Sequence, residues 1–172
     1  MFELIILFVL LLVVISIVYT SLKVGISPMP SSFKACRAMI EATKDNKSQT
    51  IIDVGSGFGF LALNFASKYP HTKVIGYEIS FFPWAVSMAL KWLSRYDNIT
   101  FHHKNFLNEE FDKESLIVCY LFPKGMSDLE VKLNNENIDI TCVVSNTFSF
   151  PQKKPKKIIY LDDLYKTPIY IY

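Results

Sequence analysis

The chain alternates between short apolar runs and longer segments of helical character. The apolar runs are rich in Val, Ile, Phe and Tyr and are bounded by polar or proline-containing stretches, a pattern typical of strands in a buried sheet. Strands are predicted at Thr50–Val54, Lys73–Glu78, Ile99–His103, Ser115–Leu121, Thr141–Ser145, Lys156–Leu161 and Pro168–Tyr172. Helices are predicted at Phe33–Thr43, Phe60–Tyr69, after Ser80, and at Ser127–Leu133. This alternation predicts an α/β fold with a parallel sheet, and the two late strands predict a hairpin with one antiparallel strand.

The N-terminus differs from the rest of the chain. Residues Phe2–Tyr19 are almost all apolar and contain neither Gly nor Pro. A membrane-spanning helix needs about 20 apolar residues, so this run is long enough to be one. No basic residue precedes it and no small-residue cleavage site follows, which favours an uncleaved single-pass transmembrane anchor over a signal peptide. The run has no polar face at all, which argues against a buried core helix. Basic residues follow it, so the positive-inside rule predicts that the domain lies on the cytoplasmic side of the membrane; they are Lys23, Lys34 and Arg37.

This pattern divides the chain into three parts. Residues 1–22 form the predicted anchor, 23–32 a Pro/Ser linker, and 33–172 the folded domain. Ser31 or Ser32 is predicted to cap the first helix of the domain. The segment Pro123–Gly125 is predicted to be a loop, and the stripe formed by Trp84, Met88 and Trp92 on one helix face is predicted to pack in the core.

A glycine-rich turn follows the first predicted strand, with the sequence Gly55-Ser56-Gly57-Phe58-Gly59. Glycines at alternate positions let the backbone turn sharply and approach a ligand closely. The backbone N–H groups of such a turn, at a helix start, face the ligand. Asp53 is placed to accept hydrogen bonds from a cationic or N–H-bearing group, and Glu78, ending the second strand, can accept both hydroxyls of a ribose. The spacing G-x-G-x-G differs from the dinucleotide fingerprint, which makes nucleotide-dependent oxidoreduction a distant alternative.

Composition narrows the possible partners. The chain has 172 residues, enough for one α/β domain, and a net charge of +2 that provides no strong field for nucleic acid. The three cysteines form no C-x-x-C pair and are predicted to be free thiols in a reducing compartment. His102 and His103 are adjacent on a strand and point to opposite faces, so no metal site is predicted. The lysine cluster at 153–157 is either a solvated loop or a contact with anionic headgroups or with an acidic patch of the substrate.

The strand, glycine turn, helix and acid-terminated second strand resemble the nucleoside site of class I S-adenosylmethionine-dependent methyltransferases. Further stretches resemble small membrane-associated protein-lysine methyltransferases, which include the mitochondrial enzyme for the ATP synthase c subunit and archaeal relatives. These stretches are Gly76-Tyr77-Glu78-Ile79 with Pro83-Trp84-Ala85-Val86, Pro28-Met29-Pro30-Ser31-Ser32, Phe122-Pro123 with Met126, Leu129-Glu130 and Lys132-Leu133, and Ser145-Asn146-Thr147-Phe148-Ser149-Phe150-Pro151. The turn departs from the family pattern G-S-G-D-G-R, because Phe58 and Phe60 replace an acid and a base.

The resemblance implies a Rossmann-like seven-stranded methyltransferase sheet, mostly parallel with one antiparallel strand, and an enzyme that transfers a methyl group from S-adenosylmethionine. It implies cofactor contacts from Asp53, Gly55, Ser56, Gly57, Gly59, Glu78, Ile79, Asn105 and Phe106. It also implies a protein acceptor that is methylated on a lysine. The residues implied to bind this substrate are Pro28, Met29, Pro30, Ser31, Phe122, Pro123 and Phe148. Tyr120 is the candidate for orienting the amine, and Phe150 is expected to line the same aromatic channel.

Several alternatives remain open at this stage. Asn105 can be an ordinary turn residue, and the aromatic residues after the fourth and fifth strands can be sheet-end packing. The acceptor can be a small molecule or a lipid instead of a lysine. The two phenylalanines of the glycine turn are also compatible with a catalytically degenerate binding module of the same fold.

Overall fold

The computed structural model describes residues 31–112, 114–136 and 142–172, together with residues 3–4, 6–8, 11 and 14 near the N-terminus. Within these residues, no helix is long and apolar enough to cross a membrane. The predicted anchor at 2–19 lies for the most part outside the described residues, and so does the linker as far as residue 30.

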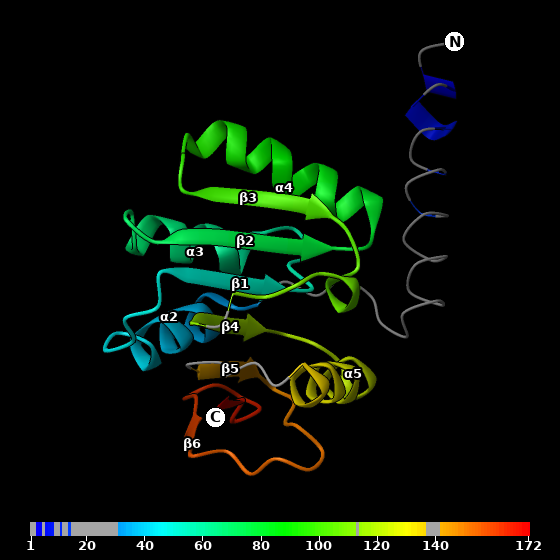
Figure 1. The fold of residues 1–172 in the computed structure, drawn as a ribbon. Coiled ribbons are helices and arrows are strands. Elements are labelled where there is room, and N and C mark those ends of the chain that lie inside the picture. Colours follow the sequence, from blue (N-terminus) through cyan, green and yellow to red (C-terminus); the bar gives the residue numbers. More distant parts are fainter. Residues whose placement is uncertain are drawn as a thin grey trace.

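The described part of the chain forms a seven-stranded sheet in the order β3-β2-β1-β4-β5-β7-β6 (Figure 1). The strands are β1 Thr50–Val54, β2 Lys73–Glu78, β3 Ile99–His103, β4 Ser115–Cys119, β5 Cys142–Asn146, β6 Lys157–Tyr160 and β7 Pro168–Ile171. β7 lies antiparallel between β5 and β6, and the pairs among β1 to β5 are parallel. The predicted sheet, with its single antiparallel strand, is therefore confirmed.

Helices cover the sheet because its central strands are apolar on both faces. The helices of the domain are α2 Phe33–Ala42, α3 Phe60–Lys68, α4 Phe81–Ser94 and α5 Pro123–Asn135, with a short 3-10 helix, η1, at Phe106–Asn108. Alternate residues of β1 enter different cores: Ile51 packs with Met39 of α2 and Phe65 of α3, and Ile52 packs with Leu129 of α5. Every residue of β1 and β4 is buried, as expected for strands with helices on both sides.

Two local predictions were wrong. Pro123–Gly125 is the first turn of α5 and not a loop, because proline has no N–H to lose at the start of a helix. The stripe on α4 is not a core stripe, since Trp92 is 80% exposed and Met88 is also exposed. The buried side of α4 consists instead of Pro83 and Ser87, with Trp84 half-buried beside the core.

The ends of the strands differ slightly from their predicted bounds. β4 ends at Cys119 and not at Leu121, because its neighbour β1 leaves the sheet after Val54 and offers no further partner. The first predicted cap is confirmed, with the Oγ of Ser32 accepting a hydrogen bond from the backbone N–H of Ala35 at 3.1 Å.

Candidate functional site

Most of the predicted site residues within the described part of the chain come together at one edge of the sheet, where the parallel strands end. β1 ends just before the glycine turn, β2 ends at Glu78, and β4 ends one residue before Tyr120. β1 has β2 on one side and β4 on the other, so the strand order reverses at this point. In open α/β sheets, ligands bind outside the carboxyl ends of the strands at such a switch point.

Backbone hydrogen bonds fix the glycine turn against the end of β2. The N–H groups of Gly55 and Ser56 both donate to the carbonyl of Tyr77 at 2.9 Å. The N–H of Gly59 donates to the carbonyl of Ser56 at 2.8 Å, which closes the turn before α3 begins. The turn is therefore preorganised by the strand beside it.

Two glycines of the turn have different roles. At Gly59, with φ of +81°, an added Cβ would lie 2.6 Å from Phe101 Cζ and 2.8 Å from Ser87 Cβ, so glycine is required for packing beneath the turn. At Gly57, with φ of +53°, an added Cβ would meet no atom within 4 Å. Gly57 thus presents bare backbone to open space, which is what a closely approaching ligand needs.

Glu78 connects the end of β2 to this turn. Its Oε2 accepts a hydrogen bond from the N–H of Gly57 at 2.8 Å, and its Oε1 accepts one from the N–H of Ser80 at 2.7 Å. A carboxylate has about four acceptor positions, so two remain for hydroxyl donors of a ligand. The next residue, Ile79, keeps an exposed side chain at the same edge.

The residues after β3 form the neighbouring side of this region. The Oδ1 of Asn105 accepts a hydrogen bond from the N–H of Leu107 at 3.1 Å and caps η1. Asn105 therefore has a structural role in this turn, as the alternative interpretation expected. Its amide nitrogen belongs to the other half of the side chain and can still donate. Nε2 of His103 lies 2.9 Å from the carbonyl oxygen of Ile79, which ties the end of β3 to the residue after Glu78. Phe106 is half-buried beside the second core cluster.

Asp53 is the most perturbed carboxyl of the site. It is 1% exposed, and among the described residues its Oδ2 has no hydrogen-bond partner. Burial raises the pKa of Asp53 to about 7; a backbone hydrogen bond from Ala62 opposes this rise, and the charge of Glu78 adds to it. Buried polar atoms in proteins are nearly always paired, so an orphaned carboxylate oxygen beneath a glycine turn fits a donor supplied by a ligand.

An aromatic cluster stands beyond the ends of β4 and β5. The ring of Phe148 stacks on that of Tyr120 at 6.4 Å between centroids and meets the edge of Phe122 at 5.8 Å. Phe150 does not join them, contrary to the sequence-based expectation. It is buried against Tyr172 at 4.6 Å, and its N–H donates to the Tyr172 hydroxyl, so it belongs to the core beneath α5.

The end of β5 contributes one residue that the sequence-based site lacks. Asn146 is buried, its Nδ2 lies 3.5 Å from the Oγ of Ser31, and its Oδ1 accepts from the Thr147 hydroxyl at 3.1 Å. Thr147 has φ of +69°, a conformation that β-branched residues rarely adopt. The sequence signal that could have identified Asn146 is its position as a polar residue at the end of an apolar strand.

The predicted substrate residues lie in different places. The contact with Asn146 brings Ser31 to the site edge, and Pro123 is exposed in the first turn of α5. Pro28, Met29 and Pro30 lie outside the described residues.

Of the two unusual phenylalanines near the turn, Phe58 packs toward α4. The ring centroid of Phe58 lies 6.5 Å from that of Phe60 and 6.4 Å from that of Phe82. Phe60 remains exposed at the start of α3. The Phe60 ring does not occupy the position next to Gly57, where an added Cβ would meet no atom within 4 Å outside the two neighbouring residues.

Comparison with known proteins agrees with this geometry. Residues 53–157 match the family model described as the ANTKMT methyltransferase domain. A protein-lysine N-methyltransferase from Saccharolobus islandicus is 24% identical over 139 residues, which cover 78% of this chain and 84% of the relative.

Solved structures share the fold. An RNA methyltransferase from Salinibacter ruber, crystallised with S-adenosyl-L-homocysteine, superposes with a TM-score of 0.73 at 19% identity, covering 84% of this chain and 92% of that one. TrmK from M. capricolum, also with S-adenosyl-homocysteine, has a TM-score of 0.61 at 16% identity and covers 82% of this chain and 67% of its own. The family model spans more than half of the chain, from the end of β1 to the start of β6, and includes the site edge described above. The chain therefore belongs to the ANTKMT methyltransferase domain family, and it is a class I methyltransferase that uses S-adenosylmethionine.

Proposed function

We propose that this protein is a membrane-anchored protein-lysine N-methyltransferase that acts on a membrane-associated protein. The observation that carries the proposal is the aromatic cluster of Tyr120, Phe122 and Phe148 at the same sheet edge as the glycine turn. The family match and the protein-lysine methyltransferase of Saccharolobus islandicus support the same acceptor chemistry.

The residues at the carboxyl ends of β1, β2 and β3 would bind the cofactor. The turn from Gly55 to Gly59, with Ser56 and the bare backbone of Gly57, would accommodate the amino-acid end of S-adenosylmethionine, with Asp53 accepting from its amino group. Glu78 would accept the ribose hydroxyls at its free lone pairs. Ile79, Asn105 and Phe106 would enclose the adenine. The fit rests on the orphaned Oδ2 of Asp53 and on the open space at Gly57.

The aromatic cluster has a chemical task in this proposal. S-adenosylmethionine supplies an already activated methyl group, so the protein mainly has to bind, desolvate and align the acceptor. A lysine attacks only as the neutral amine, and an apolar surrounding lowers its pKa by disfavouring the ammonium form. The rings of Phe122 and Phe148 would provide this surrounding, and the hydroxyl of Tyr120 would accept a hydrogen bond that orients the amine. The segment Pro28–Ser31, with Pro123, would contact the acceptor protein.

The location of the enzyme is part of the same proposal. Residues 1–22 would span the bilayer, 23–32 would link the anchor to the domain, and 33–172 would lie on the cytoplasmic side. The support is the apolar composition of Phe2–Tyr19 and the basic residues that follow it.

The test uses the full chain in detergent micelles, incubated with membrane fractions and S-adenosylmethionine tritiated on its methyl group. Label is expected in protein bands and, after acid hydrolysis, in methylated lysine. The variant Y120F should lower the rate roughly tenfold, the effect of one lost hydrogen bond, while the exposed tyrosine variant Y160F serves as the matched control. Label in the organic extract would instead identify a lipid acceptor, and cofactor binding without any label would indicate a degenerate module.

A further inference from the structure

Exposed phenylalanines mark the edge of the sheet where the site lies. α2, α3 and α4 begin at Phe33, Phe60 and Phe81, and Phe122 caps α5; all four side chains are exposed, Phe33 by 87%. Helix starts usually carry acidic residues that complement the helix dipole, yet none of these four helices has one in its first turn. The edge is therefore apolar where solvated helix ends are normally acidic.

The loop between β6 and β7 extends this apolar edge. β6 runs parallel to β1, so the loop leaves the sheet on the same side as the glycine turn. It carries Leu164 and Tyr165, which are 89% and 85% exposed. The Nζ of Lys34, in the first turn of α2, donates to the carbonyl of Asp162 at 2.7 Å and holds this loop beside Phe33. We call the set Phe33, Phe60, Phe81, Phe122, Leu164 and Tyr165 the apolar rim.

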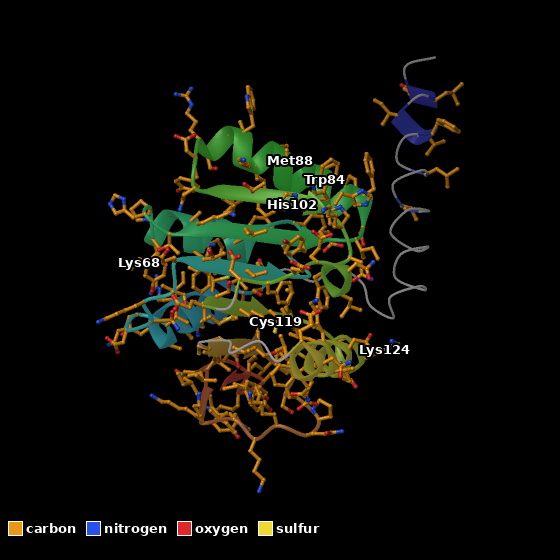
Figure 2. All side chains as sticks on the ribbon, viewed as in Figure 1. Lys68, Trp84, Met88, His102, Cys119 and Lys124 are labelled. Atoms are coloured by element: carbon orange, nitrogen blue, oxygen red, sulfur yellow. The ribbon has the colours of Figure 1, made fainter. Side chains whose placement is uncertain are left out.

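The charges near the rim are largely paired with each other. Lys124 lies at the start of α5, at the opposite edge of the sheet from Lys68 (Figure 2), and forms an ion pair with Asp128 at 2.8 Å. Lys166 lies 3.5 Å from Asp162. Such a surface has little net charge and many apolar side chains, a combination that in soluble proteins marks contact with another molecule or a membrane.

The point at which the chain enters the domain indicates what the apolar rim contacts. The apolar run Phe2–Tyr19 is followed by eleven residues before Ser31, which lies at the rim next to Asn146. Eleven residues span at most about 40 Å even when fully extended, so an anchored domain stays within this distance of the bilayer. Phe33 follows Ser31 by two residues, so the rim adjoins the point of attachment.

We propose that the apolar rim lies against the lipid bilayer, so that the cofactor site and the aromatic cluster open toward the membrane surface. This inference rests on the proposed function, since it needs the anchor. Phenylalanine, leucine and tyrosine side chains insert at the headgroup level, and lysines beside them contact phosphates. The acceptor lysine would then lie close to the membrane plane, at the end of a membrane-spanning segment of the substrate.

A competing surface lies at the opposite edge. Trp92 and Leu93 are exposed near the end of α4, and the lysine cluster at 153–157 ends beside β7, where the N–H of Lys156 donates to the carbonyl of Ile171. If this edge contacted the bilayer, the cofactor site would face away from it. The two orientations place different residues in lipid, which makes them distinguishable.

The experiment measures fluorescence quenching by phosphatidylcholine brominated on its acyl chains, using the full chain in liposomes. Three variants each carry one tryptophan: F33W with W84F and W92F, Y165W with the same two changes, and W84F alone, which retains Trp92 as the matched exposed control. Far-ultraviolet circular dichroism and binding of S-adenosylmethionine verify that each variant is folded.

Brominated lipid should quench the first two variants at least about twofold more than the variant that retains Trp92. Equal quenching, or stronger quenching of Trp92, in protein that floats with the liposomes would overturn the orientation while leaving the anchor and the methyltransferase intact. Protein that does not float with the liposomes would refute the anchor and the orientation together. Loss of lysine labelling with retained quenching would refute only the proposed acceptor.

Discussion

Replacing Asp53 with asparagine removes a carboxyl whose charged form is destabilised by the core around it. Burial raises its pKa from 3.8 to about 7, so in the folded protein it holds its proton far more strongly than in the unfolded chain. Between about pH 4 and pH 7 the folded state therefore binds more protons, and the free energy of unfolding falls as the pH rises. The cost is absent below pH 4 and complete above pH 7.

The size of this cost follows from the pKa. One pKa unit corresponds to about 1.4 kcal/mol, so the rise from 3.8 to about 7 corresponds to roughly 4 kcal/mol at most. Total stabilities of small domains are about 5–15 kcal/mol, which makes this a large fraction. Asparagine keeps an oxygen for the Ala62 N–H and carries no charge. We expect D53N to equal the wild type at pH 4 and to exceed it by roughly 2–4 kcal/mol at pH 8 without cofactor.

Urea unfolding of the full chain in detergent, followed by the fluorescence of half-buried Trp84, measures the difference between pH 4 and pH 8. E41Q is the control, because Glu41 is exposed and pairs with the exposed Lys44, so this substitution should leave the pH dependence of the unfolding free energy nearly unchanged. If the unfolding free energies of D53N and the wild type changed with pH in parallel, the carboxyl of Asp53 would not be the source of the pH dependence. S-adenosylmethionine should stabilise the wild type more than D53N, because only the carboxylate can pair with the amino group of the cofactor.

Three further predictions concern the same edge of the sheet. E78Q should weaken S-adenosylmethionine binding by roughly 10- to 100-fold in calorimetric titration, since a neutral amide replaces a charged acceptor of two hydroxyls; wild-type affinity would contradict its assignment to the ribose. G59A should lose roughly 3 kcal/mol or more of unfolding free energy, because the added Cβ would collide with Phe101. G57A should lose about 1 kcal/mol of unfolding free energy, and its main effect should be weaker cofactor binding. Similar melting temperatures for the two variants would disprove this division. Cys36 and Cys119, whose thiol pKa values burial raises to about 11 and about 12, should resist alkylation at pH 7.5 in the folded protein, and rapid labelling monitored by mass spectrometry would show that they are accessible.

The period of the hydrophobic pattern was sufficient to predict most of the sheet. β1, β2 and β3 have the predicted bounds, because strands buried on both faces must be continuous apolar runs flanked by polar turns. The late hairpin was predictable for a related reason, since its short connection permits only an antiparallel pair. The glycine turn and Glu78 were recognisable because a sharp turn after a buried strand favours glycine and an acid at the end of an apolar strand stands out in the sequence.

Other features depend on neighbours that are distant in sequence. The exposure of Trp92 was not predictable from helical spacing, because the spacing shows which residues share a face and not whether another element covers that face. Phe148 and Phe150 are two residues apart on one segment, and only the arrangement of Tyr120 and Tyr172 places the first at the sheet edge and the second in the core.

The sequence by itself determined the fold class, the position of the glycine turn and the acid that ends the neighbouring strand, because each depends on local spacing and residue type. Only the tertiary structure decided that Asp53 is buried with an unpaired oxygen, that Asn146 meets Ser31, and that the exposed phenylalanines of four helices share one edge. These features arise where parallel strands end together, and the order in which strands pair is set by packing between segments far apart in the chain.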